Sequence, residues 1–313
     1  MNILLTGSWD DTERDAWAAA LRAAMPGHTL WLSREGVAAE AIEAAIVANP
    51  APGQLQGLPR LRLIQSLWAG VDRLLGDASL PAGVPIARMV DPAMNAAMAE
   101  TALWAVLSLH RGFFRYARQQ QQGVWQELPQ RRADELHVLV LGLGQMGRTA
   151  ALRLRQQGYR VSAWRRAGGD AAPEGVERLS GAPALRGALP GVDVLVNLLP
   201  LTPETRGLLD ESLFAALPRG AGIVNLARGA HLDEAALLAA LDSGQIGHAV
   251  LDVFQTEPLP AGHRFWGHPQ VTLLPHAAAQ TDLRSAAAIA AANLEALAAG
   301  RPLMNLVQPA RGY

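Results

Sequence analysis

The sequence contains no cysteine among its 313 residues, which excludes disulfide bonds, thiolate nucleophiles and cysteine-type metal sites. It also has no apolar run of about eighteen residues, the length that a membrane-spanning helix needs. The N-terminal stretch MNILLTG carries no basic side chain and is too short an apolar run for a secretion signal. We therefore expect a soluble, cytoplasmic protein.

An excess of charge of one sign is absent as well. The 27 lysine and arginine residues nearly balance the 28 aspartate and glutamate residues. No long basic run marks a surface for nucleic acid or for an anionic membrane. The histidines form no H-x-x-x-H pair, so we expect no metal site. Half of the residues are hydrophobic, which excludes intrinsic disorder, and the length suffices for two ordinary domains.

Short apolar runs alternate with helical patterns along most of the chain, and such alternation predicts parallel α/β sheets. In the first part we expect strands at Asn2–Leu5, Thr29–Leu32, Leu63–Leu67 and Pro85–Ala87, and a helix over Asp11–Ala24. A long helical pattern over Ala93–Gln121 follows. The second series has expected strands at Val138–Leu141, Arg160–Trp164, Val194–Asn197, Ile223–Asn225, His248–Leu251 and Val271–Leu274. Expected helices of this series are Met146–Gln157 and Asp233–Ser243, and an Ala-rich helix over Thr281–Ala299 ends the pattern.

A glycine-rich turn opens the second series. Its residues, in order, are Gly142, Leu143, Gly144, Gln145, Met146 and Gly147, which fit the pattern G-x-G-x-x-G. An apolar strand leads directly into the turn and an amphipathic helix leads out of it, which is the setting of a dinucleotide-binding turn. Gly142 would make the tight turn, Gly144 would admit the pyrophosphate, and Gly147 would let helix and strand pack closely. The alternative is a strand-to-helix turn without a ligand.

About twenty residues after the glycine turn, the next strand should end in the side chain that binds the adenosine ribose. An acid at this point would bind the 2′-hydroxyl of NAD, but the chain has Trp164, Arg165 and Arg166 there and no acid before Asp170. Two guanidinium groups suit a 2′-phosphate, and such charge-assisted bonds contribute about 1.5–3 kcal/mol each. NADP is therefore favoured, and NAD remains open because no further basic residue follows the pair. The alternative is a solvated pair of surface arginines.

These patterns predict an α/β fold with two Rossmann-like, doubly wound parallel-sheet domains. The dinucleotide-binding domain, residues 96–279, is inserted in a substrate domain made of residues 1–95 and 280–313. The chain would then cross between the domains near residues 95 and 280.

Three charged side chains follow expected strands of the second series, on the edge of the sheet where ligands bind. They lie in Asn225-Leu226-Ala227-Arg228-Gly229, in the stretch 251–258 that holds Glu257, and in Leu274-Pro275-His276. Each alone has an ordinary alternative as a surface or loop residue. As an ordered set they point to catalysis.

Together with the glycine turn, these motifs resemble the D-isomer-specific 2-hydroxyacid dehydrogenase family, and within it the NADPH-dependent glyoxylate/hydroxypyruvate reductase branch. The resemblance extends from the loop Ser66–Asp72 to Pro275–Ala278. It implies that Arg228, Glu257 and His276 are the catalytic residues. The chemistry agrees, because Arg228 is a permanent cation for a keto acid and His276 can donate a proton near neutral pH. Glu257 would bind the other ring nitrogen and stabilise the imidazolium.

The resemblance also implies further contacts. Besides Arg228, the substrate residues would be Trp68, Ala69, Gly70 and Val71, with Trp68 either narrowing the pocket toward small acids or packing beneath the loop. Cofactor contacts outside the glycine turn and the segment 164–166 would be Leu199, Pro200, Thr205, Leu226, Ala227, Asp252, His276 and Ala278. After His276 the chain has Ala277–Ala279, without the hydroxyl that some relatives carry.

The function expected from the sequence is NADPH-dependent reduction of a small 2-keto acid, glyoxylate or hydroxypyruvate, to the D-2-hydroxy acid. Alternatives are a reductase for larger 2-keto acids such as phenylpyruvate, a dehydrogenase that oxidises a D-hydroxy acid with NAD, and a non-catalytic protein that senses the nucleotide. Family analogy also implies a homodimer, for which the apolar side chains Trp104, Phe113 and Phe114 offer a contact. The alternative is that these side chains pack in the interior.

Overall fold

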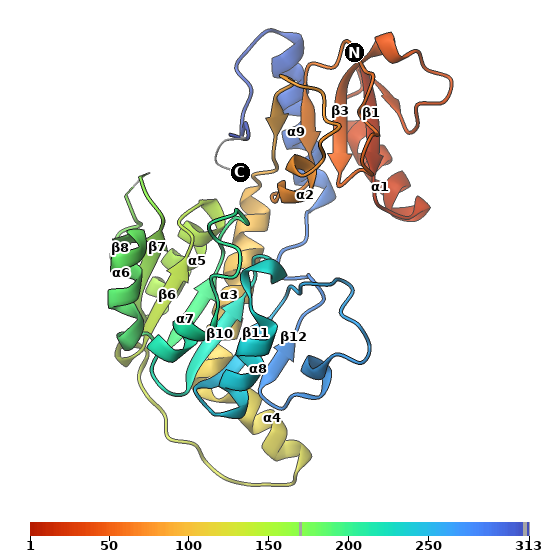
Figure 1. Cartoon of the computed structure of the whole chain (residues 1–313). Coiled ribbons are helices and arrows are strands. Elements are labelled where there is room, and N and C mark those ends of the chain that lie inside the picture. Colours follow the sequence, from red (N-terminus) through yellow and green to blue (C-terminus); the bar gives the residue numbers. More distant parts are fainter. Residues whose placement is uncertain (169–170, 309–311, 313) are drawn as a thin grey trace. The chain divides into compact units, whose positions relative to one another are not determined.

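The computed structural model describes residues 1–168, 171–308 and 312, so that Asp170 lies outside the described residues. The chain divides into two compact units (Figure 1). Unit 1 comprises Met1–Met94 and Thr281–Tyr313, and unit 2 comprises Asn95–Gln280. Each unit is built around one parallel sheet.

Unit 1 contains a five-stranded sheet in the order β2-β1-β3-β4-β5. Its strands are β1 (Asn2–Gly7), β2 (Thr29–Trp31), β3 (Ile42–Ala48), β4 (Ile64–Ser66) and β5 (Ile86–Ala87), and all neighbours are parallel. Its helices are α1 (Asp11–Ala24), α2 (Asp72–Leu75) and α9 (Leu283–Ala298). Asp10 caps the start of α1 by accepting a hydrogen bond from the Glu13 N–H, and α1 packs against α9.

Unit 2 contains a seven-stranded parallel sheet in the order β12-β11-β10-β9-β6-β7-β8. Its strands are β6 (His137–Leu141), β7 (Arg160–Arg165), β8 (Glu177–Ser180), β9 (Val194–Asn197), β10 (Ala221–Asn225), β11 (Ile246–Leu251) and β12 (Val271–Leu273). The order reverses between β6 and β9, as it does in Rossmann folds. In such sheets ligands bind beside this reversal, at the carboxyl ends of the strands.

Helices cover both faces of the seven-stranded sheet. They are α3 (Pro92–Arg111, which begins in unit 1), α4 (Phe113–Gln121), α5 (Gln145–Gln156), α6 (Gly181–Ala188), α7 (Glu211–Ala216) and α8 (Glu234–Asp242). Short 3₁₀ turns lie at Ala39–Ala41, Ala133–Glu135, Leu189–Gly191, Gly229–His231 and Arg264–Gly267. Leu139 and Leu141 of β6 pack in the core with α6, α7 and α8, whereas Val138 and Val140 pack in the core with α3 and α5. The alternation follows from the two-residue period of a strand.

The predicted α/β class with two parallel sheets is confirmed, but several elements differ from the expectation. The sequence analysis predicted no strand at Ile42–Ala48, where β3 forms the buried centre of the first sheet. The single helix expected over Ala93–Gln121 is wrong. It breaks at Gly112, whose φ of 71° is left-handed and ends the regular hydrogen bonding of α3. The short elements β8, α6 and α7 were not predicted either.

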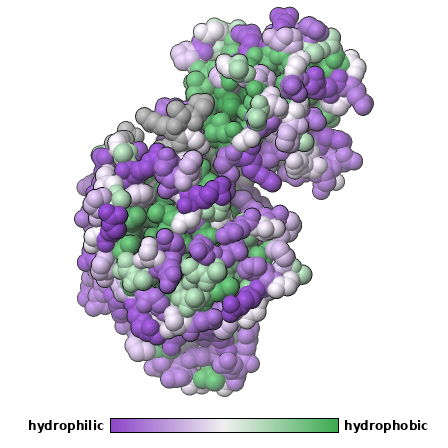
Figure 2. Space-filling view, viewed as in Figure 1, coloured by the Kyte–Doolittle hydropathy of each residue, from purple (hydrophilic) through white to green (hydrophobic). Residues whose placement is uncertain are grey.

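On the face of unit 2 shown in Figure 2, hydrophilic side chains cover most of the helices, with smaller apolar areas between them. In the described part of the chain, none of the helices combines the length and the apolar character required to cross a bilayer.

Candidate active site

The glycine turn has the geometry that its sequence pattern predicts. A Cβ on Gly147 would lie 2.0 Å from the Gly142 carbonyl oxygen, and a Cβ on Gly142 would lie 2.6 Å from that of Leu198. A residue with a side chain therefore does not fit at Gly142 or Gly147 without a shift of the backbone. At Gly144, by contrast, a Cβ would meet nothing within 4 Å, and the residue is exposed. No side chain caps α5, which begins at Gln145, so its first N–H groups can bind an anion. The turn thus fits a pyrophosphate.

The end of β7 carries the two arginines predicted to read the adenosine ribose. Trp164 is buried in the core, and its indole N–H donates to the Gly181 carbonyl oxygen at 2.8 Å. The Nε of Arg165 is buried and has no hydrogen-bond partner among the described residues. The guanidinium group of Arg166 lies 2.5 Å from the carboxylate of Glu204. Two cations at this position, one with an unpartnered buried nitrogen, fit a 2′-phosphate.

Two buried asparagines brace the loops beyond β9 and β10. Asn197 donates to the Asn225 side-chain oxygen at 3.0 Å, and Asn225 donates to the Arg228 carbonyl oxygen at 3.1 Å. The Asn197 oxygen accepts from the Leu199 N–H, and the Asn225 oxygen accepts from the Ala227 N–H. The backbone on either side of Arg228 is therefore fixed to the end of the sheet. Sequence reasoning did not single out Asn197, although a polar residue closing an apolar run is a readable signal.

His276 and Glu257 form a hydrogen-bonded pair. Nδ1 of His276 lies 2.8 Å from Oε2 of Glu257, and the other carboxylate oxygen accepts from the Phe254 N–H at 2.9 Å. The side chains are 52% and 36% exposed, so the pair faces solvent on one side. The hydrogen bond to Glu257 raises the pKa of His276 above its ordinary value of 6.5, against an opposing effect of partial burial and of the nearby Arg228.

The carboxylate of Glu257 is held in its ionised form. Partial burial raises its pKa, but the hydrogen bonds from His276 and from the Phe254 N–H, together with the charges of His276 and Arg228, outweigh burial. The net pKa of Glu257 is therefore below its ordinary value. The positive charge of Arg228 lowers the pKa of both Glu257 and His276, so Arg228 lies near this pair. The three predicted catalytic side chains are therefore brought together.

The backbone of His276 is held in an unusual conformation. Its φ of 53° is left-handed, which is uncommon for a residue other than glycine. Asp252, at the end of β11, accepts hydrogen bonds from the Ala277 N–H at 2.7 Å and from the Ala278 N–H at 3.2 Å. The His276 N–H donates to the Asp252 carbonyl oxygen at 2.9 Å. Burial raises the pKa of Asp252 above its ordinary value in spite of these bonds.

The other predicted cofactor residues of unit 2 lie mostly in the loops that follow the carboxyl ends of the strands. Leu199, Leu226, Ala227 and Ala278 are buried, and Met146 packs against the core. Thr205 donates from its hydroxyl to the Pro200 carbonyl oxygen at 2.8 Å. Every one of these segments follows the carboxyl end of β6, β7, β9, β10, β11 or β12. Because the strands are parallel, the segments meet at one edge of the sheet.

The predicted substrate loop lies in unit 1. Residues 68–71 connect β4 to α2. The Ser66 hydroxyl accepts from the Trp68 N–H at 3.0 Å and donates to the Trp68 carbonyl oxygen at 3.1 Å, which closes the loop tightly. The Trp68 ring is half-buried and meets Trp17 edge-on, with centroids 6.1 Å apart.

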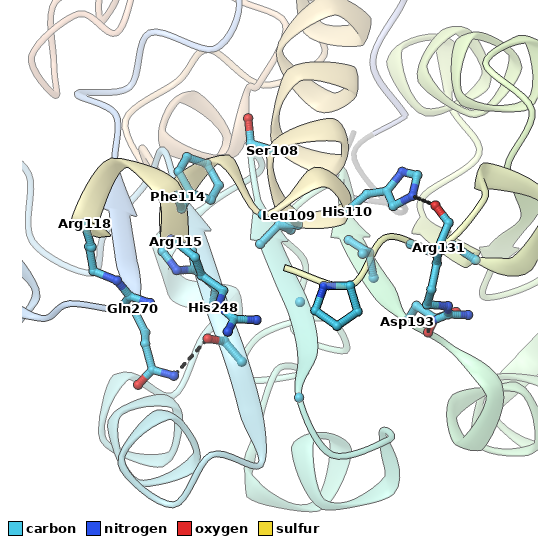
Figure 3. Close-up of a pocket in the computed structure, with 17 residues that line it drawn as sticks. Ser108, Leu109, His110, Phe114, Arg115, Arg118, Arg131, Asp193, His248 and Gln270 are labelled. Atoms are coloured by element: carbon cyan, nitrogen blue, oxygen red, sulfur yellow. Dashed lines mark hydrogen bonds and ion pairs between the residues drawn. The ribbon is translucent and has the colours of Figure 1, made fainter. Parts of the chain in front are cut away.

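A separate cavity of about 440 Å³ opens at the opposite edge of the unit 2 sheet (Figure 3). Arg115, Arg118 and Gln270 lie on one side of it, and Arg131 and Asp193 lie on the other. It is lined by residues of α3, α4, the segment between α4 and β6 and the amino ends of the strands, and by none of the predicted catalytic, substrate or cofactor residues. In the described ranges, no group of three or more histidine, aspartate or glutamate side chains could hold a metal ion.

Comparison with known proteins gives consistent matches over the chain. The family described as D-isomer specific 2-hydroxyacid dehydrogenase, NAD binding domain, matches residues 103–278. The glyoxylate/hydroxypyruvate reductase A of Serratia proteamaculans is 40% identical, with 100% of both chains covered. A D-isomer specific 2-hydroxyacid dehydrogenase of Xanthobacter autotrophicus, solved with NADPH and MES, is 41% identical with a TM-score of 0.94 over 100% of this chain and 99% of the other. The NADPH-dependent glyoxylate/hydroxypyruvate reductase of Sinorhizobium meliloti, solved with NADP and sulfate, is 33% identical with a TM-score of 0.92 over the same shares.

Proposed function

Because the chain belongs to the D-isomer specific 2-hydroxyacid dehydrogenase family, we propose that it reduces glyoxylate, hydroxypyruvate or a similarly small 2-keto acid to the D-2-hydroxy acid with NADPH. The observation that carries this proposal is the His276–Glu257 pair beside Arg228, on the sheet edge that also holds the glycine turn. The names of the relatives, which are glyoxylate/hydroxypyruvate reductases, support the choice of substrate.

The side chains divide the reaction between them. NADPH, when bound, would supply the hydride for the keto carbon. Arg228 binds the carboxylate and carbonyl of the keto acid and holds them in orientation through its planar guanidinium group. Since Nδ1 of His276 is engaged by Glu257, Nε2 is the atom that donates a proton to the carbonyl oxygen. Glu257 remains ionised and stabilises the imidazolium before the transfer.

We assign unit 2 as the dinucleotide-binding domain, with the cofactor bound at the carboxyl ends of its strands. Gly144 and the start of α5 would hold the pyrophosphate, and Arg165 and Arg166 would hold the 2′-phosphate. The relatives solved with NADPH or NADP support this assignment. The contacts of Leu199, Pro200, Thr205 and Asp252 with the nicotinamide side rest on the family resemblance.

We assign unit 1 as the substrate domain, with backbone N–H groups of residues 69–71 binding the substrate carboxylate. The bracing of this loop by Ser66 supports the role, because a fixed backbone can present N–H groups without reorganisation. We further propose that Trp68 sets the preference for small acids. If Trp68→Ala leaves the ratio of kcat/KM for glyoxylate and phenylpyruvate unchanged, this role of Trp68 is wrong.

We also propose that the protein is a cytoplasmic homodimer that associates through unit 2. Trp104 and Phe113 are 40% and 53% exposed beside an apolar groove, and Trp125 is 98% exposed. The groove is lined further by Leu103, Leu107 and Phe114. Exposed aromatic side chains of this kind are typical of protein interfaces. Sedimentation of the Trp104→Glu variant should show a monomer where the native protein shows a dimer.

The reaction is tested by following NADPH and NADH oxidation with the purified protein over a panel of small and aromatic 2-keto acids. We expect turnover with glyoxylate and hydroxypyruvate, faster with NADPH. His276→Ala should lower kcat by about 10²–10⁴ while NADP⁺ still binds, because His276 is one of many predicted cofactor contacts. His268→Ala, which changes a histidine paired with Asp242, is the matched control. Absence of turnover with every acid, at normal NADP⁺ binding, would instead support a nucleotide sensor.

A further inference from the structure

Arg166 and Glu204 form an ion pair across the crevice of the seven-stranded sheet. Arg166 follows β7 and Glu204 lies in the loop after β9, and these two strands flank β6, which leads into the glycine turn. Nη1 of Arg166 lies 2.5 Å from Oε2 of Glu204. The ion pair therefore spans the point where the strand order reverses, beside which this fold binds nucleotides.

Glu204 is fixed and charged. The Thr202 hydroxyl donates to its Oε2 at 2.8 Å, and this bond, a backbone N–H and Arg166 together hold the pKa of Glu204 below its ordinary value. The carboxylate is thus present at neutral pH and points at the cation predicted to bind the 2′-phosphate.

The position of Glu204 bears on the choice between NADP and NAD, which the sequence leaves open. The end of β7 lacks the acid that accepts a hydrogen bond from the ribose 2′-hydroxyl of NAD in this fold. Glu204, in the loop after β9, brings a carboxylate against the arginine that follows β7.

On the basis of the cofactor site assigned above, we propose that Arg166 and Glu204 together read the 2′ position of the adenosine ribose, and that Glu204 limits the preference for NADPH. When the cofactor carries a 2′-phosphate, Arg166 exchanges Glu204 for the phosphate. When it carries a 2′-hydroxyl, the ion pair stays intact and Glu204 accepts a hydrogen bond from the hydroxyl.

The charge of Glu204 should affect the binding of NADPH and of NADH in opposite directions. The carboxylate repels a phosphate dianion and competes with it for Arg166, so Glu204 weakens NADPH binding. A neutral hydroxyl suffers no such repulsion and gains an acceptor, so Glu204 strengthens NADH binding. Both side chains are about half exposed, at 47% and 57%, and an exposed ion pair exchanges partners at little cost. Arg165, whose Nε is buried and has no partner among the described residues, is the cation that Glu204 does not occupy.

The test is calorimetric titration of the full-length Glu204→Gln variant with NADP⁺, NAD⁺, adenosine 2′,5′-bisphosphate and ADP. We expect NADP⁺ and the bisphosphate to bind about 1.5- to 5-fold more tightly and NAD⁺ to bind about 1.5- to 5-fold more weakly, the range of an exposed ion pair. Glu211→Gln, the same change at an exposed residue at the start of α7, should alter none of these constants.

The Arg166→Gln variant and the double variant with Glu204→Gln complete a double-mutant cycle. Arg166→Gln alone should weaken NADP⁺ and bisphosphate binding, and adding Glu204→Gln to it should then change NADP⁺ affinity much less than in the native background. Equal shifts for NADP⁺ and NAD⁺, or no shift for either, would overturn the proposal. Tighter NADP⁺ with unchanged NAD⁺ would overturn the role of Glu204 toward the hydroxyl. These titrations need no turnover, so they separate this inference from failure of the proposed reaction.

Discussion

Nδ1 of His276 and Oε2 of Glu257 lie 2.8 Å apart, so that the carboxylate engages one ring nitrogen, and Nε2 is the nitrogen that the proposed mechanism uses. The bond fixes the orientation of the ring and raises the pKa of His276. A proton donor must be protonated before each turnover, and the carboxylate favours that state.

As pH rises, the Glu257→Gln variant should therefore lose reductase activity earlier, at a lower pH than the native protein does. The rate of reduction is full below the pKa of His276 and falls as pH rises through it. Removing the carboxylate removes the main cause of the raised pKa, so the alkaline limb of kcat/KM should shift toward lower pH. At neutral pH kcat should fall by up to about 10², the lower end of the contribution of a positioned acid. A pH profile identical to that of the native enzyme would contradict the role of Glu257.

The Gly144→Ala variant should fold normally but bind NADP⁺ poorly. The new methyl group meets nothing within 4 Å, and the φ of −78° at this residue suits alanine, so unfolding free energy should change by less than about 0.5 kcal/mol. The same methyl group would stand where the pyrophosphate must approach the backbone. Gly267→Ala, at another glycine with open space, is the control for both measurements. Unchanged NADP⁺ affinity in Gly144→Ala would argue against the glycine turn as the pyrophosphate site.

The Asp252→Asn variant should lower both stability and turnover. Its two oxygens accept from the Ala277 and Ala278 N–H groups, and an amide can replace only one of them as an acceptor. The buried N–H of Ala278 is shared between Oδ1 and Oδ2, so the amide would leave it Oδ1 alone and set its own NH2 group against the donor, which costs about 1 kcal/mol of unfolding free energy. Since this turn positions His276, kcat should fall more than KM rises. Urea unfolding and steady-state kinetics on the same preparation would measure the two effects.

The pH dependence of stability should contain a contribution from His248. Burial, aided by Arg118, lowers the pKa of His248 to about 4, and its ring stacks on Phe114 with centroids 4.6 Å apart. Between about pH 6.5 and pH 4 the unfolded chain binds a proton that the folded chain does not, so stability falls as pH falls, by up to roughly 1.4 kcal/mol per pH unit. His248→Gln should flatten this slope in thermal unfolding between those pH values. An equal slope in both proteins would show that folding does not lower the pKa of His248.

The geometry of the glycine turn and the gathering of Arg228, Glu257 and His276 could be predicted because their signals are local or follow strand ends. A glycine pattern between an apolar strand and a helix leaves few alternatives, and parallel strands bring their carboxyl ends together. The strand β3 could not be predicted in the same way. Its sequence, IEAAIVA, is rich in alanine, which has a low preference for strands, and only burial on both faces of the sheet makes it one.

The remaining features depend on contacts between segments that are distant in the sequence. The Arg166–Glu204 pair joins loops after two different strands, and no spacing rule links them. The break at Gly112 is visible only as a glycine inside a helical pattern, which many helices tolerate. The family resemblance read from the motifs is confirmed by relatives that match the whole chain.

The left-handed backbone of His276 has a consequence for how far this protein can be stabilised. A residue with a Cβ in this conformation costs roughly 1–2 kcal/mol relative to glycine, so the backbone conformation of His276 opposes folding. Between two inactive variants, His276→Gly should thus unfold at a higher urea concentration than His276→Ala. The hydrogen bond to Glu257 offsets part of this cost, and the proposed proton transfer accounts for a histidine in a conformation that favours glycine.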